Sequence, residues 1–329
     1  MPDGRNLMLV YDDTWEGFLT AVFYAYAEGG AARSTARIAI ASCTRCQPCW
    51  EQELREIATD DALADRVVKG IQRTMGQAGY EQVWTGFLSG DSRKEEILFP
   101  FIRLGMKEGR RVHQLITDDR VIAMNKLSGL VGREAHMLIQ FTRFSCMEGG
   151  VYYAAVTPEH RCLPLIMPHF AERFNIQPFI LHDKTHNVAG VFDRKEWVIA
   201  SAEGLTLPDS SADQRSWERM WKAFYDTIAI RERENPRCRM NHMPKKYWKN
   251  MVEMTLPPTP DDIALPTRPL TSPLPTRENA AIGAVQPRQA AHRRAHLPAG
   301  NGLPDTDASP PISEEDGQHE PHVQSLKQR

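Results

Sequence analysis

The chain has 329 residues, of which 41% are hydrophobic and 25% charged, a composition typical of a globular protein with one large domain or two ordinary ones. Its net charge of -2 excludes a histone-like protein that binds nucleic acid through bulk positive charge. The sequence contains neither a signal peptide nor the roughly 18 consecutive apolar residues of a transmembrane helix, so we expect a cytoplasmic protein without a membrane partner.

The first half of the chain is expected to be mainly helical. Residues 7–11 form an apolar run typical of a strand, and Thr14 is suited to cap a helix that ends near Glu28, before Gly29 and Gly30. Apolar residues between Trp15 and Tyr26 recur at helical spacing and predict one face that packs on a core. Further helices are predicted at residues 61–77, 80–89, 92–108 and 111–127.

The pattern then changes to strands. Residues 134–144 and 151–157 are rich in aromatic and β-branched side chains and are separated by a turn-like Glu-Gly-Gly. A helix at residues 163–174 precedes three strands, at 179–182, 188–192 and 196–201, whose short turns favour an antiparallel meander. A last helix is predicted at residues 212–230. The fold class is therefore α+β, with a helical N-terminal part packed with an antiparallel β-meander and with C-terminal helices.

The composition changes sharply near residue 257. From Pro257 onward the chain carries 13 of its 23 prolines and no Phe, Trp or Tyr. Such a segment buries too little apolar surface to offset the entropy of ordering. We expect an α+β domain over residues 1–256 and a disordered Pro-rich tail over residues 257–329.

Three of the six cysteines lie close together as Cys43, Cys46 and Cys49. Two C-x₂-C steps could place thiolates around one Zn²⁺ ion or an iron–sulfur cluster, with a fourth ligand from a distant residue. The alternative is a loop of partly exposed thiols without any cofactor.

Four histidines lie near the predicted strands: His160, His169, His182 and His186. They form no recognised ligand motif, so ordinary hydrogen bonds are the simpler interpretation.

No motif of an ATP-binding, dinucleotide-binding or α/β-hydrolase site is present, and catalytic residues remain unknown.

The most unusual stretch is residues 229–250, which contains seven Lys and Arg residues but only two Glu residues. Cations for phosphates beside aromatic faces for base stacking are typical of proteins that bind single-stranded or distorted nucleic acid. The candidate nucleic-acid-binding residues are Arg231, Arg233, Asn235, Arg237, Lys245, Lys246, Tyr247 and Trp248. The alternative is a basic surface strip whose Tyr and Trp attach the segment to the core.

Several separated segments resemble one bacterial family. They are YDDTWEGFLTA at residues 11–21, REAH at 133–136, PHFAER at 168–173, WERMWKAFY at 217–225, RENP at 233–236 and MPKKYWK at 243–249. Together they resemble the DUF4130 family over roughly residues 6–254. The resemblance implies a role in DNA metabolism, because members are encoded beside a radical SAM DNA-repair protein and some are fused to a uracil-DNA-glycosylase-like domain.

From the residues and the resemblance together we expect an accessory protein of DNA repair or modification that binds DNA, a radical SAM partner or both. A uracil-DNA-glycosylase-like protein is a further partner that the resemblance implies. One alternative is a metal-dependent DNA-processing enzyme that uses the Cys43–Cys49 cluster, and a second is a protein scaffold that does not bind DNA.

Overall fold

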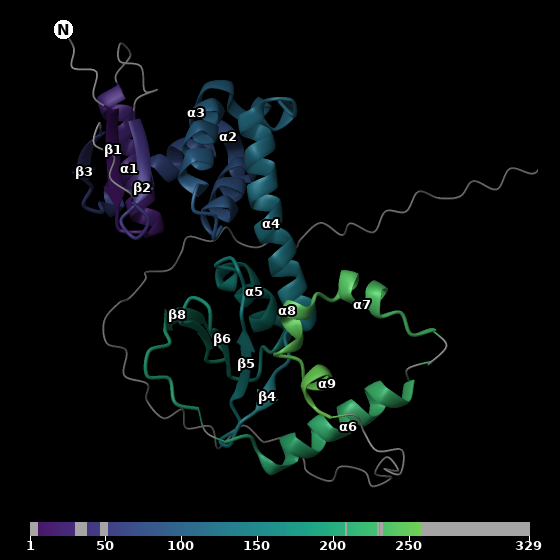
Figure 1. The fold of residues 1–329 in the computed structure, drawn as a ribbon. Helices are drawn as coiled ribbons and strands as arrows, with labels where there is room; N and C mark the ends of the chain where they lie inside the picture. Colours follow the sequence, from purple (N-terminus) through teal and green to yellow (C-terminus); the bar gives the residue numbers. More distant parts are fainter. Residues whose placement is uncertain are drawn as a thin grey trace, which may run out of the picture. The chain divides into compact units, whose positions relative to one another are not determined.

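The computed structural model describes residues 6–29, 38–46, 52–207, 209–228, 230 and 233–257 (Figure 1). The predicted tail therefore lies outside the described residues, apart from Pro257. Among the described residues, no helix combines the length and the apolar character needed to cross a membrane.

The N-terminal part contains a small parallel sheet that the sequence did not predict. Strand β1 (Asn6–Tyr11) is central, and β2 (Ile38–Ser42) and β3 (Gln52–Glu56) both pair with it in parallel. Helix α1 (Trp15–Gly29) follows β1. The expected cap is confirmed, because the Thr14 hydroxyl accepts a hydrogen bond from the Gly17 N–H at 3.0 Å. The helical N-terminal part is thus preceded by, and joined to, an α/β segment.

Three longer helices follow. Helix α2 (Asp61–Phe87) joins the predicted helices at 61–77 and 80–89 across a kink at Gly76, whose φ of 78° suits glycine. Helix α3 (Lys94–Glu108) is followed by a short 3₁₀ helix, η2 (Gly109–Gln114), and by α4 (Asp119–Phe141). The predicted helix at 111–127 is therefore wrong in its bounds.

The predicted strand at residues 134–144 is also wrong, because α4 extends through Phe141. Buried residues of α4 continue at helical spacing from Leu127 through Val131, Ala135 and Leu138. This continuous apolar face packs against α2, α3 and α5, and tertiary packing outweighs the local β preference of the segment.

The second sheet has the order β4-β5-β6-β7-β8. Its strands are β4 (Ser145–Cys146), β5 (Tyr152–Val156), β6 (Phe179–Asp183), β7 (Val188–Phe192) and β8 (Trp197–Ser201). The meander β6-β7-β8 is antiparallel as predicted, whereas β5 and β6 are parallel because helix α5 (Leu163–Arg173) connects them. Alternate residues such as Ala154, Phe179 and Leu181 are buried on one face of the sheet.

Within the described residues, four C-terminal helices complete the α+β fold: α6 (Ala212–Ile228), α7 (Pro236–His242), α8 (Lys245–Trp248) and α9 (Val252–Thr255). Helix α8 begins directly after Pro244. The predicted bounds of β5, α5, β6, β7, β8 and α6 agree with the structure within about two residues.

Candidate nucleic-acid interface

Helix α7 carries two of the seven Lys and Arg side chains of residues 229–250. Asn235 caps the helix, since its Oδ1 atom accepts a hydrogen bond from the Cys238 N–H at 2.9 Å, and Pro236 occupies the first helical position. Arg237 and Arg239 are exposed on this helix, as is Arg233 just before it. The predicted contact residue Asn235 thus has a structural role that shapes the helix.

Helix α8 is attached to α4 by two side chains of the basic strip. The Lys246 ammonium group donates a hydrogen bond to Oε1 of the buried Glu134. Tyr247 is only 6% exposed, and its ring packs on Phe141 with a centroid separation of 5.5 Å. The buried Tyr247 ring is not accessible for stacking on a base, so it supports the surface instead of forming part of it.

Glu134 is the anchor of this attachment. Besides Lys246, it accepts hydrogen bonds from the backbone N–H groups of Glu159 and His160, at 2.8 and 2.7 Å. Burial alone would raise the pKa of Glu134, but the Lys246 hydrogen bond and the two backbone donors outweigh burial and lower it. The carboxylate is therefore held in its charged form and fixes the position of α8.

Trp248 lies on the other side of α8 and is partly exposed. Its indole N–H donates to the Met243 carbonyl oxygen at 2.9 Å, which fixes the ring. The Arg239 guanidinium lies 5.3 Å and the Lys245 ammonium 5.9 Å from the ring centroid. An aromatic face flanked by two cations is an arrangement suited to a base and its phosphates.

The exposed cations of this strip are unpaired within the described part of the chain. Arg233, Arg237, Arg239, Lys245 and Lys249 form no ion pair with another described residue, whereas Lys246 does. Positive charge that is not compensated locally is available to an anionic ligand.

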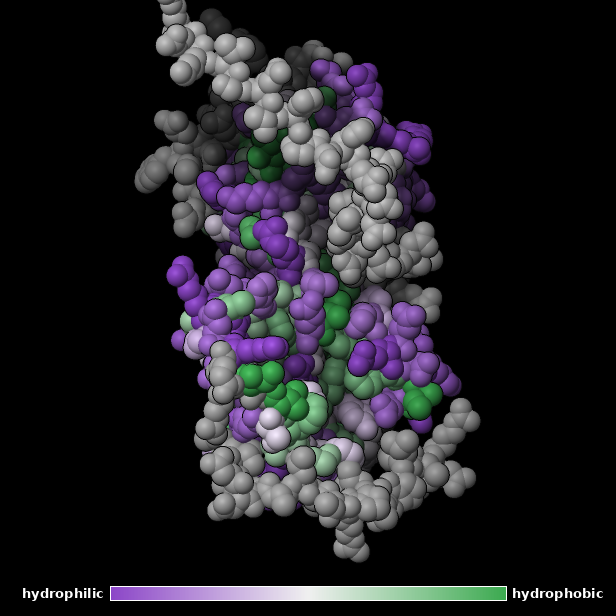
Figure 2. All heavy atoms as spheres, turned by 90° about the vertical axis from the view of Figure 1, so that its right-hand side faces the viewer, coloured by the Kyte–Doolittle hydropathy of each residue, from purple (hydrophilic) through white to green (hydrophobic). Residues whose placement is uncertain are grey.

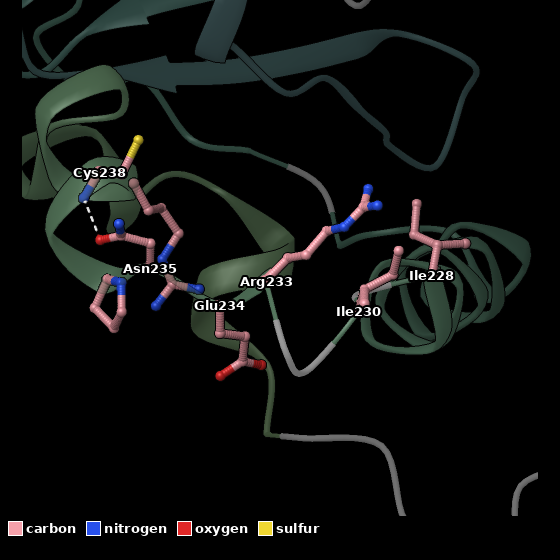
Figure 3. Close-up of a pocket in the computed structure, with 8 residues that line it drawn as sticks. Ile228, Ile230, Arg233, Glu234, Asn235 and Cys238 are labelled. Carbon is pink, nitrogen blue, oxygen red and sulfur yellow. Dashed lines mark hydrogen bonds between the residues drawn. The ribbon is translucent and has the colours of Figure 1, made fainter.

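A shallow pocket of about 390 Å³ separates α7 from the end of α6. Figure 3 shows Arg233 extending toward Ile228, while Glu234 points away from that side chain. Ile228, Ile230 and Pro236 supply apolar lining, and Arg233 and Arg239 supply positive charge. The pocket combines apolar walls with guanidinium groups, which are the two components that a nucleotide base and its phosphate require.

Of the eight residues predicted to bind nucleic acid, the structure brings Arg233, Asn235, Arg237, Lys245 and Trp248 to helices α7 and α8 and the segment before them. Arg231 lies outside the described residues. Sequence reasoning missed Arg239 as a contact residue, although its place beside Trp248 follows from the same run of cations.

The cysteine cluster is only partly described. Cys43 is exposed and Cys46 partly exposed in the turn after β2, with the Cys46 Sγ atom 3.6 Å from the Met8 sulfur, and Cys49 lies outside the described residues. Among the residues with a described position, no group of three or more His, Cys, Asp and Glu side chains is arranged to hold a metal ion.

Three of the four histidines singled out from the sequence have a hydrogen-bond partner, which confirms the simpler interpretation for them. His160 accepts from the Gly90 N–H, His182 contacts the Tyr153 hydroxyl at 3.0 Å, and His186 contacts the buried Asp183 carboxylate at 2.6 Å. Burial lowers the pKa of His182, so this ring is neutral near pH 7.

A cluster of polar and charged side chains, separate from the basic strip, lies where strands β1 and β2 end. Sequence reasoning did not find this cluster. Its members are Tyr11, Asp13, Arg45, Lys94, Glu95 and Arg161. Asp13 contacts both Arg45 and Arg161, and the Tyr11 hydroxyl donates to Glu95 at 2.6 Å. Both carboxylates are paired, so the cluster joins the N-terminal sheet to α3 and to the segment before α5.

Lys94 is the fully buried member of this cluster. Its ammonium group donates to the Phe87 carbonyl oxygen at 2.9 Å and lies 4.1 Å from the centroid of the Phe87 ring. Burial, followed by the positive charge of Arg45, lowers the pKa of Lys94 to about 8.

The fold and the strip of unpaired cations define an α+β protein with a surface suited to an anionic polymer. Residues 92–253 match the model of the family described as DUF4130, a domain of unknown function, so the chain belongs to this family over those residues. The match begins just before α3 and ends in α9, and therefore omits the motif at residues 11–21. No curated protein and no solved structure matches the chain.

Proposed function

We propose that this protein is an accessory factor of DNA repair or modification that binds DNA through α7 and α8. The observation that carries the proposal is the group of unpaired cations around the fixed, partly exposed ring of Trp248. Phosphate contacts supply most of the affinity of such surfaces, and aromatic faces add stacking on unpaired bases.

The rigid attachment of α8 supports this role. The Lys246–Glu134 pair and the buried Tyr247 ring hold the helix on α4, so that Lys245, Trp248 and Lys249 face outward without first having to be ordered. A surface that is ordered before binding loses less conformational entropy in the complex.

The proposal includes a radical SAM DNA-repair protein as the enzyme that this factor assists, and a uracil-DNA-glycosylase-like protein as a further partner. A metal-dependent activity of the cysteine cluster is the alternative that needs a cofactor. Metal analysis of protein purified without oxygen tests it, because a metal-free, folded protein would remove that alternative.

The DNA-binding surface is tested by changing Lys245 and Lys249 together to Ala. Each phosphate neutralised on single-stranded DNA contributes about 0.7 to the slope of log affinity against log salt, so the slope should become shallower by about 1.4. The measurement is fluorescence anisotropy with labelled single-stranded DNA at several salt concentrations. Lys246 is left unchanged, because its loss would also disturb the buried Glu134.

The matched control changes Lys69 and Lys107 to Ala. Both are exposed on other helices, α2 and α3, so this variant removes the same charge and should keep the wild-type slope. An equal effect of both variants would show attraction through overall charge only. If wild-type protein binds the radical SAM partner but not DNA, the protein is a scaffold and the proposed surface is wrong.

A further inference from the structure

Helix α6 exposes its apolar face. Trp217, Trp221, Phe224 and Ile228 follow one another at helical spacing, and each is between 43% and 58% exposed. The Trp221 and Phe224 rings lie 5.8 Å apart. We call these four residues the α6 stripe. Figure 2 shows hydrophobic side chains at the surface of the molecule on the right-hand side of Figure 1, where α6 and α7 lie.

Part of the remaining surface of α6 is covered by the protein, whereas Arg215 and Arg219, opposite the stripe, are exposed. Lys222 and Ala223 are 8% and 5% exposed, and Lys222 pairs with Asp226 at 2.7 Å. On a neighbouring part of the helix surface, Glu218 accepts a hydrogen bond from Ser145 on β4 at 2.8 Å. Exposed aromatic side chains along one face of α6 are unusual for a surface helix, whose apolar face ordinarily packs on the core. Such an apolar face indicates a binding surface.

The described chain ends beside this helix. Helix α9 packs against α6, and only Leu256 and Pro257 follow α9 before the described residues end. The residues that come next in the sequence therefore start close to helix α6. A covalently linked segment has an effective concentration of about millimolar, so even a weak contact is populated.

The next part of the sequence has the composition that an aromatic surface binds. Residues 263–275 read IALPTRPLTSPLP, with Pro266 and Pro269 in a P-x-x-P arrangement and with leucines at 265, 270 and 274. Segments of this kind favour the polyproline II conformation and bind to rows of aromatic side chains. We infer that residues 263–275 bind to the α6 stripe of the same chain.

The lengths are compatible with this contact. Between Pro257 and Ile263 there are five residues, which span roughly 20 Å in an extended chain. The stripe from Trp217 to Ile228 is about 16 Å long at 1.5 Å per residue. In polyproline II the five steps from Leu265 to Leu270 extend over about 15 Å. The leucines can therefore contact opposite ends of the stripe while the prolines lie over the rings.

The test is photo-crosslinking in the full-length protein. Phe224 is replaced by p-benzoylphenylalanine, which is tolerated because this position is 45% exposed. After illumination at low protein concentration, mass spectrometry should find cross-links to residues 263–275 within the same chain. The same replacement at Ile116, which is 69% exposed and lies outside α6, should give none to that segment.

A pair of tail variants completes the experiment. Changing Leu265 and Leu270 together to Asp removes the apolar contacts and should lower the cross-link yield about tenfold, the ratio that corresponds to 1.4 kcal/mol. Changing Leu297 and Leu303 to Asp makes the same chemical change outside the segment and should leave the yield unaltered. Cross-links between two chains that increase with concentration would assign the stripe to a second copy and overturn the inference. An absence of cross-links to residues 263–275 would overturn it as well.

Discussion

Lys245 and Lys246 are adjacent in the sequence, but their side chains lie in different surroundings. Lys246 points to the buried carboxylate of Glu134, whereas Lys245 lies beside the exposed face of Trp248. The motif MPKKYWK therefore contains residues that attach α8 and residues that remain available to a ligand. At the residue scale, Glu134 accounts for the different roles of the two lysines, because it holds the Lys246 side chain against α4.

We predict that Glu134→Gln destabilises the protein. The amide carries no charge for Lys246 and cannot accept the backbone hydrogen bonds of Glu159 and His160 as strongly, so we expect a loss of about 1–3 kcal/mol in the free energy of unfolding. Urea denaturation at pH 7 measures it. Glu159→Gln is the matched control, because the Glu159 side chain is 75% exposed and lies 3.9 Å from the same ammonium group. It should change stability by less than about 0.5 kcal/mol.

The comparison of wild type with Glu134→Gln also predicts how the stabilisation by Glu134 depends on pH. The pKa of Glu134 is lowered in the folded state, so its contribution to stability is present above the ordinary glutamate pKa of about 4.3 and is lost as the pH falls through the lowered value. The difference in unfolding free energy between wild type and Glu134→Gln should therefore shrink below about pH 4. A difference that stays constant down to pH 3 would show that the charge of Glu134 does not contribute.

At the element scale, α8 has a buried side and an exposed side. Tyr247→Ala should cost about 3–5 kcal/mol of unfolding free energy, as for other buried aromatic residues, whereas Tyr247→Phe retains the packing on Phe141.

Trp248, on the exposed side of α8, should behave differently. Trp248→Ala should leave the fold intact and weaken binding of single-stranded DNA about ten- to a hundredfold, by roughly 1–3 kcal/mol. Thermal melts and anisotropy separate the two effects. Unfolding of Trp248→Ala would assign this ring to the core instead.

The same helix shows what sequence reasoning could and could not predict. The run of cations was visible in the sequence. The sequence left open whether Tyr247 stacks on a base or attaches the segment to the core, because its burial depends on Phe141 and Glu134 of α4, more than 100 residues earlier. Local composition predicts which segment is basic, but long-range packing decides which of its side chains are exposed.

The errors in the predicted elements have a related cause. Residues 134–141 look like a strand locally, but they continue the buried face of α4 beyond Val131. Strand β3 was missed because its sequence, QELRE, is mostly charged. Its place is set by backbone pairing with β1, which composition does not reveal.

At the scale of the whole molecule, long-range contacts join the N-terminal sheet to residues 92–253, the segment that matches the family model. Asp13 adopts a φ of 64° between β1 and α1, and its carboxylate binds Arg161, which is 148 residues away. Burial opposes ionisation of Asp13, but Arg161 outweighs it and lowers the pKa. Fully buried Lys94 of α3 lies in the same cluster. Residues before the family match thus contribute directly to the environment of residues within it.

We predict that residues 92–257 alone do not fold, although they contain the whole family match. Helix α2 packs against both α3 and α4, and its Val83 is fully buried. Without α2, the buried side chains of Leu98, Ile102 and Met124 would be exposed to water, at a cost of about 25 cal/mol for each Å² of apolar surface.

Differential scanning calorimetry and dye binding test this boundary with two fragments. Residues 1–257 should melt in one cooperative transition, whereas residues 92–257 should show no cooperative transition and should bind a hydrophobic dye. The comparison keeps α6 to α9 identical in the two fragments, so a difference between them reports on the first 91 residues. Cooperative melting of the shorter fragment with native near-UV circular dichroism would show that the family segment folds independently. The domain predicted over residues 1–256 would then consist of two folding units.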